Sequence, residues 1–204
     1  GLILGITGPR GVAGDTAVKM NFFNATSGRR EILKSPVLNM SSLVKPIMNF
    51  YVAKKPYTGG ENDSLEVVVS TDCGTTFFSA TTVYNKGDVS TPSLATRPPA
   101  TGAFTPDSAI QWRHETIDLS NVAGQSSVII GFRAKSNFGN NGWIDNIIID
   151  DADALCNNTV TGVGSYSCNP LVTIDFTATP APPSGNRAAL SGGIKTTESA
   201  NGMS

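Results

Sequence analysis

Residues 128–150 are the part of this sequence that most constrains its fold. Two apolar, β-branched runs flank a loop of Asn and Gly at residues 136–142. This is the composition of two antiparallel strands joined by a turn. Because side chains alternate along a strand, the second run places one row of residues on a common face. That row contains Trp143, Asp145, Ile147 and Ile149.

Asp145 is the chemical anomaly in that row, because the other members are apolar. An ionised carboxylate that leaves water without compensation costs several kcal/mol. Such a group is therefore protonated, bonded to backbone N–H groups, paired with a cation such as Arg133, or bound to a metal. The periodicity leaves these alternatives open.

The composition favours a β-rich protein and disfavours two classes of partner. Only 15% of the 204 residues are charged, and the net charge is -1. A near-neutral chain without a basic run is unsuited to nucleic acid or to an anionic membrane surface. The pair Lys54 and Lys55 is isolated and is expected to be solvated surface. No segment approaches the roughly 18 apolar residues that cross a bilayer, so we expect no membrane insertion.

Alternating apolar residues predict a single β-sandwich over residues 1–153. Outside the opening stretch, the clearest alternation is at residues 46–53, 65–69 and 111–119. Residues 85–109 have no such periodicity. A loop of that length in a compact domain is usually functional, or is held by packing residues. Leu94 and Phe104 are the candidates for that packing.

Residues 154–204 differ in character from the sandwich. They are rich in Pro, Ala, Gly and Ser, and one strand is predicted in them, at residues 171–177. A segment with so little to bury cannot form a core alone. We expect a linker and the truncated start of a second β module, partly flexible.

The three cysteines indicate one disulfide. Cys156 and Cys168 lie close together in a turn-rich segment, and a bridge between them is worth about 3 kcal/mol in the chain-entropy model. Cys73 is then either a buried free thiol or the partner of a cysteine outside this chain. No pair has the CxxC spacing of a zinc site.

The order of several motifs resembles a known family. SPVLNMSS, PIMNFYV, DSLEVVVSTDCGTTF and the run from WRHETIDLS to WIDNIIID follow one another as in a jelly-roll module of secreted Bacteroidota proteins. These modules are called cleaved-adhesin-like or choice-of-anchor J domains, and they are similar in architecture to MAM domains. The resemblance covers roughly residues 18–150. STDCGTTF and the succession from WRHETIDLS to IDNI are its most specific parts.

The resemblance implies an all-β fold, an antiparallel jelly-roll β-sandwich followed by a short irregular C-terminal segment. Such modules often hold a structural calcium ion near the last strand, and the family's carboxylate falls on Asp145. Calcium takes roughly six to eight oxygen ligands, so others are needed. We expect Asp15, just before a predicted strand, to be one of them. The family's N-terminal strand with a Trp is missing, so either residues 2–6 replace it or the module is incomplete.

The resemblance also implies a setting. Such modules occur in large surface proteins and in substrates of the type IX secretion route, so we expect a secreted or cell-surface location. The partners would be neighbouring domains of a longer protein, and surface glycans or the secretion machinery. The run LVTIDFTATPAPP resembles the opening of a PKD-type Ig-like repeat. Triplets similar to the O-glycan acceptor of that phylum predict modification of Thr16, Ser64 and Ser108.

The expected function is a non-catalytic binding or spacer module, acting in adhesion or glycan contact. The alternative is an accessory domain of a secreted protease or glycosidase whose catalytic unit lies outside this chain. His114 is the only histidine and no GxSxG motif is present, so no catalytic triad is predicted. Tyr57 and Phe138 lie in predicted loops and are the candidates for stacking on sugar rings.

Overall fold

The computed structural model describes residues 3–6, 17–77 and 84–152, together with the backbone of three short strands nearer the C-terminus. Within this part of the chain no helix is long and apolar enough to cross a membrane. The short 3-10 helices are η1 (Phe22–Asn24), η3 (Ala109–Gln111) and η4 (Ser120–Val122). The strands are β1 (Ile3–Ile6), β2 (Val18–Met20), β3 (Arg30–Lys34), β4 (Pro46–Lys54), β5 (Ser64–Ser70), β6 (Tyr84–Gly87), β7 (Arg113–Asp118), β8 (Ile129–Lys135), β9 (Gly142–Asp151), β10 (Val172–Asp175), β11 (Arg187–Ala189) and β12 (Lys195–Glu198).

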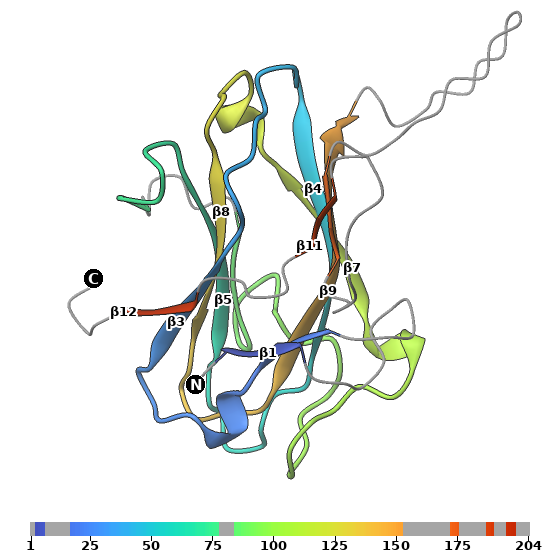
Figure 1. The fold of residues 1–204 in the computed structure, drawn as a ribbon. Coiled ribbons are helices and arrows are strands. Elements are labelled where there is room, and N and C mark those ends of the chain that lie inside the picture. Colours follow the sequence, from blue (N-terminus) through green and yellow to red (C-terminus); the bar gives the residue numbers. More distant parts are fainter. Residues whose placement is uncertain are drawn as a thin grey trace, which may run out of the picture.

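The strands form two sheets in the order of a jelly roll (Figure 1). One sheet contains β2, β9, β4 and β7 as successive neighbours, and the other contains β3, β8, β5 and β6. All pairings among these strands are antiparallel. Consecutive strands from β2 to β9 therefore alternate between the sheets, except for the hairpin of β5 and β6 within one sheet, and this order is that of a jelly roll. The predicted all-β antiparallel sandwich is confirmed.

Further strands extend both sheets. β1 pairs with β2, and Ile3 lies opposite Met20. This agrees with the alternative in which residues 2–6 supply the additional N-terminal strand. The predicted strand at residues 171–177 corresponds to β10, which lies antiparallel to β9, and β12 lies antiparallel to β3. The assignment of residues 154–204 to a linker and a second module stays a prediction.

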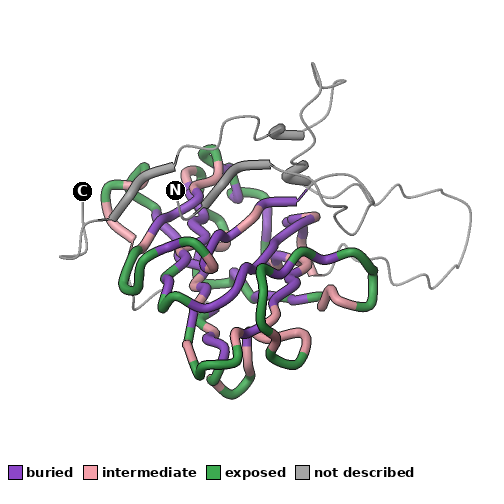
Figure 2. Tube along the Cα trace, turned by 90° about the horizontal axis from the view of Figure 1, so that it is seen from below, coloured by how far each residue is buried: buried purple, intermediate pink, exposed green. Residues whose placement is uncertain are grey.

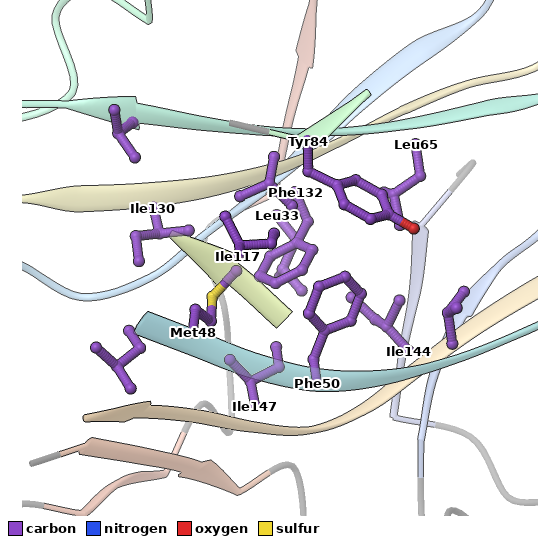
Figure 3. Packing of buried hydrophobic residues seen from close by; sticks show 14 of the residues in the cluster. Leu33, Met48, Phe50, Leu65, Tyr84, Ile117, Ile130, Phe132, Ile144 and Ile147 are labelled. Atoms are coloured by element: carbon purple, nitrogen blue, oxygen red, sulfur yellow. The ribbon is translucent and has the colours of Figure 1, made fainter. Parts of the chain in front are cut away.

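The core fills the space between the two sheets. Phe50 of β4 is fully buried, and its ring meets those of Phe132 and Tyr84 edge-on at centroid distances of 5.4 and 5.5 Å (Figure 3). Each such pair is worth about 0.5–1.5 kcal/mol beyond its burial. Buried residues follow the strands, whereas exposed ones gather in the loops (Figure 2).

A β-bulge at Asn146 corrects the predicted faces of β9. The β4 to β9 register shifts between Asn49 and Tyr51, and Asn146 has a left-handed φ of 52°. Such an extra residue reverses the alternation of side chains beyond it. Ile144 therefore shares the core with Ile147 and Ile149, whereas Trp143 packs in a separate small cluster. The prediction that Trp143, Asp145, Ile147 and Ile149 share one face is wrong.

Candidate functional site

The irregular loops gather at one end of the sandwich, at the bottom of Figure 1. We call it the loop end and define it as residues 21–29, 55–63, 88–112 and 136–141. Each segment begins or finishes at a strand terminus on this side, because the strands between them run antiparallel. Loops carried on such a scaffold are where binding residues are commonly found.

A fully buried lysine lies beneath these loops. Lys54 ends β4, and its Nζ lies 2.9 Å from Asp63 Oδ2 and 3.0 Å from Asp88 Oδ2. The ammonium also donates a hydrogen bond of 2.6 Å to the carbonyl oxygen of Asn140. All three charged side chains are 0% exposed. A buried ion is tolerated only when it is paired in this way, so the cluster is an internal charge network.

The burial of Lys54 corrects the prediction that Lys54 and Lys55 are both solvated surface. The period of two along β4 runs through Phe50 and Val52, which are in the core, and reaches Lys54 next. That alternation was the available signal. The adjacent carboxylates that make an inward lysine tolerable come from distant positions in the chain and leave no local pattern.

Asp88 is the less well satisfied carboxylate of the network. Its two oxygens accept no hydrogen bond of good geometry from the described residues, although Oδ2 lies 3.0 Å from Lys54 Nζ. Burial raises the pKa of Asp88 to about 6, and the nearby Lys54 ammonium opposes that rise. The distance and the missing hydrogen bond describe one contact, an ion pair that is close but poorly aligned. Burial thus favours the protonated form of Asp88.

Asp63 fixes the shape of the loop at residues 136–141. Its Oδ1 accepts hydrogen bonds from the backbone N–H of Asn137 at 2.8 Å and of Gly139 at 3.1 Å. Its Oδ2 accepts one from the N–H of Asn140 at 3.0 Å. A Cβ at Gly139 would lie 2.3 Å from Asp63 Oδ2, so only glycine allows the loop to wrap this closely. The loop is organised around a carboxylate rather than by strand pairing.

Phe138 lies at the tip of that loop in an unfavourable state. Its φ is 61°, and 58% of the residue is exposed. The left-handed conformation costs an L-residue roughly 1–2 kcal/mol, and an exposed ring gains little from packing in return. Unfavourable backbone held in place by its surroundings is typical of functional sites. Phe138 is exposed as the sequence predicted.

Two more aromatic rings lie at the loop end. Phe23 and Tyr57 are both half-buried, and their rings meet edge-on with centroids 6.1 Å apart. The N–H of Phe23 bonds to Asn141 Oδ1 at 3.2 Å, which ties this ring to the end of the Phe138 loop. Phe23 was not among the predicted contacts. Its neighbour Phe22 in η1 is fully buried, and no local pattern separates the two rings.

The long segment 88–112 is held at several points. The Arg113 guanidinium donates to the carbonyl oxygens of Ala95 at 2.7 Å and Ser93 at 2.9 Å. Leu94 and Phe104 are buried, in agreement with their predicted role in packing this segment. Of the two alternatives for this loop, packing is therefore the one that the structure contains.

Asp145 is placed on the outer side of its sheet. It lies opposite Tyr51 of β4, is 5% exposed, and accepts a hydrogen bond of 2.7 Å from the N–H of Asn146 at Oδ1. Asp15 lies outside the described residues. In the described part, no three His, Cys, Asp or Glu side chains form a group that could hold a metal ion. One buried carboxylate suits calcium but is too few ligands, so the calcium site stays a prediction.

The remaining predicted residues fall in separate places. Ser108 is exposed, whereas Ser64 is half-buried and its glycosylation motif uses Asp63, which is engaged in the core. Cys73 is a free and exposed thiol, so the first of its two predicted alternatives, a buried thiol, is wrong. His114 is exposed, with its ring centroid 5.1 Å from that of Tyr51. Outside the described residues lie Thr16, Cys156 and Cys168.

The sequence matches no protein-family model and no curated protein. Among solved structures, it is similar to the K1 cleaved adhesin domain of Lys-gingipain from Porphyromonas gingivalis W83, with 15% identity and a TM-score of 0.47 over 72% of this chain and 81% of that one. The K3 cleaved adhesin domain of the same protein has 16% identity and a TM-score of 0.42, over 67% and 77%. The carbohydrate-binding module TmCBM27, described for specific mannan recognition, has 15% identity and a TM-score of 0.35, over 72% and 82%. Likeness this distant carries no argument about function.

Proposed function

We propose that this chain is a non-catalytic binding module that contacts glycans through the aromatic rings of the loop end. One observation carries the proposal. Phe138 is exposed, is held in a left-handed conformation, and is fixed there by the hydrogen bonds that Asp63 accepts on both sides of it. That arrangement costs stability without improving the packing, and a binding role is what accounts for it.

The chemistry of the rings suits the C–H faces of sugars. Phe138, Tyr57 and Phe23 offer flat apolar surface, and Tyr57 adds a hydroxyl that both donates and accepts hydrogen bonds. Aromatic side chains have few rotatable bonds, so little conformational entropy is lost when they bind. The carboxylate of Asp63 has already ordered the loop that carries Phe138. A preorganised loop converts more of its contact energy into affinity.

The setting of the module is part of the same proposal. The motif order of residues 18–150 supports an adhesion module of a large secreted or cell-surface protein. Its partners would then be surface glycans, neighbouring domains of the parent protein, and the type IX secretion machinery. In such a protein the jelly roll acts as a rigid support, because function resides in the loops and not in the fold itself.

A glycan array probed with the purified chain tests the proposal. We expect wild type to bind at least one glycan and Phe138→Ala to lose most of that binding, with Tyr57→Ala weakened as well. Val44→Ala is the matched control, since Val44 is an exposed apolar residue before the opposite end of β4. Probing with and without calcium shows whether the metal contributes. Binding that survives Phe138→Ala, or an array without any bound glycan, would contradict the proposal.

A further inference from the structure

The loop end contains a polar cavity beside the aromatic rings. Its volume is about 210 Å³. It opens on the segment of residues 100–111, and Lys55 from the neighbouring loop forms part of its wall. The hydrogen bond from the N–H of Ala100 to the carbonyl of Pro56, at 3.0 Å, places it next to the loop that carries Tyr57. The polar side chains that line it are Lys55, Thr101, Thr105, Asp107 and Gln111.

The wall of the cavity is preformed by buried amides. The Asn140 side chain is 0% exposed, accepts a hydrogen bond from the N–H of Phe104 at 2.8 Å, and donates one to the carbonyl of Gly102 at 2.9 Å. The carbonyl of Phe104 accepts further bonds from Asn141 Nδ2 and Trp143 Nε1, both at 3.3 Å. Fully satisfied buried networks of this kind rigidify the backbone they hold. The cavity therefore exists before any ligand arrives.

The cavity offers both donors and acceptors. Gln111 Oε1 accepts the N–H of Asp107 at 2.8 Å, which fixes the orientation of the amide and leaves its NH2 group as a donor. The Lys55 ammonium lies 5.6 Å from the centre of the Phe104 ring. Among the described residues neither Lys55 nor Asp107 has an ion-pair partner. A hydroxyl group of a ligand can accept a hydrogen bond from the Lys55 ammonium and donate one to the Asp107 carboxylate.

The volume of the cavity and the charges of its lining residues restrict the class of ligand further. Sites for drug-sized molecules are roughly 300–1,000 Å³, so a cavity of about 210 Å³ holds one ring rather than several. The carboxylate of Asp107 would repel an acidic ring, and the ammonium of Lys55 would repel a basic ring. A neutral ring with several hydroxyls satisfies both charges at once.

We propose that this cavity binds a single neutral hexose ring. This names the class of sugar that the proposed binding module would recognise. It rests on the proposed function only in taking sugars as the ligands. The aromatic rings and the cavity are separate contacts, so their failures are distinguishable.

The test is titration of the folded chain with D-glucose, D-galactose and D-mannose, each compared with D-glucuronate and D-glucosamine, and followed by amide chemical shifts in NMR. We expect millimolar binding of at least one neutral hexose, with shifts concentrated in residues 100–111, since so small a ligand makes few contacts. Asp107→Asn and Gln111→Ala should each weaken it by up to about tenfold, because each removes one hydrogen-bonding group from a partly exposed lining. Phe138→Ala should leave it unchanged.

Asp118→Asn and Gln125→Ala are the matched controls, because both residues are exposed and lie toward the opposite end of the sandwich. The spectra also report whether each variant is folded. The inference is overturned if no neutral hexose causes shifts, if glucuronate or glucosamine binds more tightly, or if both cavity variants bind as wild type. If Phe138→Ala abolishes array binding while free hexoses do not bind, the proposed function stands without the cavity. If hexoses bind in the cavity while Phe138→Ala leaves array binding intact, the cavity stands without the aromatic contact.

Discussion

The two ends of the sandwich are held together by different interactions. At the end opposite the loop end, residues 35–45 and 119–128 are joined mainly through the backbone. Leu38 forms a β-bridge with Val128. The N–H of Met40 donates a hydrogen bond to the carbonyl of Gln125 at 2.8 Å, and the carbonyl of Met40 accepts one from the N–H of Gly124 at 3.2 Å. At the loop end, backbone hydrogen bonds such as that from Ala100 to Pro56 are joined by the side chains of Lys54, Asp63 and Asn140, which hold the loops from beneath.

The difference shows what each kind of interaction permits. Backbone pairing satisfies N–H and C=O groups only where two segments run alongside each other. A buried carboxylate accepts N–H groups that converge from a curved segment, so it can hold a loop of arbitrary shape. The loop at residues 136–141 is such a segment, and Phe138 projects from it. Irregular loops with fixed tips are suited to recognition, and the charge network is what makes them possible here.

Removing the cation of the network should have the largest effect. Lys54→Met leaves Asp63 and Asp88 buried without their counter-charge, and we expect a loss of about 3–5 kcal/mol in the free energy of unfolding. Urea denaturation followed by tryptophan fluorescence measures it. Lys135→Met, at an exposed lysine that ends β8, is the control. Similar losses in both variants would mean that the network does not hold the loop end.

Removing the charge of Asp63 should lower the free energy of unfolding by nearly as much. Asp63→Asn keeps the shape but weakens the hydrogen bonds to the 136–141 loop, and we expect a loss of about 3 kcal/mol. Amide hydrogen exchange at Asn137, Gly139 and Asn140 should become faster. Asp72→Asn is the comparison at the opposite end, where hydrogen bonds from Ser70 and Thr76 lower the pKa of Asp72 to about 2. Because Asp72 is exposed, a loss as large as that of Asp63→Asn would contradict the contrast between the ends.

A calcium ion at Asp145 would be a second cation bound to a buried carboxylate, and unlike the ammonium of Lys54 it could be removed by a chelator. If calcium binds at Asp145, a chelator should lower the melting temperature, by the equivalent of about 2.7 kcal/mol when calcium had been present at a hundred times its dissociation constant. Asp145→Asn should abolish that response while still accepting the N–H of Asn146. The measurement is differential scanning calorimetry with and without chelator. An unchanged melting curve in chelator would count against the site.

The pH dependence of stability isolates Asp88. Its pKa is raised to about 6 from an ordinary value of 3.8, so the folded state binds a proton that the unfolded state releases between these values. The contribution of this group is therefore complete below 3.8 and is lost as pH rises through about 6. From about pH 7 to about pH 4, wild type should gain about 2 kcal/mol relative to Asp88→Asn. The midpoints of urea denaturation of both proteins at each pH measure this difference. If the stabilities of the two proteins change in parallel with pH, the prediction is wrong.

Relieving the strain at Phe138 should have the smallest effect, and in the opposite direction. Phe138→Gly removes the cost of the left-handed conformation, and we expect a gain of up to about 1 kcal/mol after the added flexibility of the unfolded chain is subtracted. Phe138→Ala is the control, because it loses the ring but keeps the backbone penalty. Both variants should lose glycan binding. A stability gain in the alanine variant alone would show that exposure of the ring, and not the backbone, is the source of the cost.

The fold was largely predictable from local patterns. The alternation in residues 46–53, 65–69 and 128–150 predicted strands that the structure contains, and the motif order predicted how they are connected. Alternation reports burial on one side of a sheet, so it is strong wherever a strand lies over the core. It fails at Asn146, because an inserted residue reverses the row of side chains without changing the composition.

The candidate site was predictable only in part. Loop composition was enough to predict that Phe138 is exposed, since Asn and Gly on both sides disfavour a strand. Its backbone conformation was not predictable, because it depends on Asp63, which is distant in sequence. Lys54 was interpreted as surface for the same reason. The charge of a lysine favours water unless carboxylates from elsewhere in the chain are brought beside it.

By itself, then, the sequence of this protein determined its antiparallel strands, because periodicity and turn residues act over a few neighbouring positions. The jelly-roll connection of those strands was implied by the resemblance in motif order. Only the tertiary structure decided which charges are buried and which loops they hold. Lys54, Asp63 and Asp88 come from three separate segments. A charge is stable in the interior only when its counter-charges lie close to it, so the distances among these three residues decide whether they can be buried. Those distances are set by the packing of whole sheets. The loop end, and the binding surface proposed on it, follow from that packing.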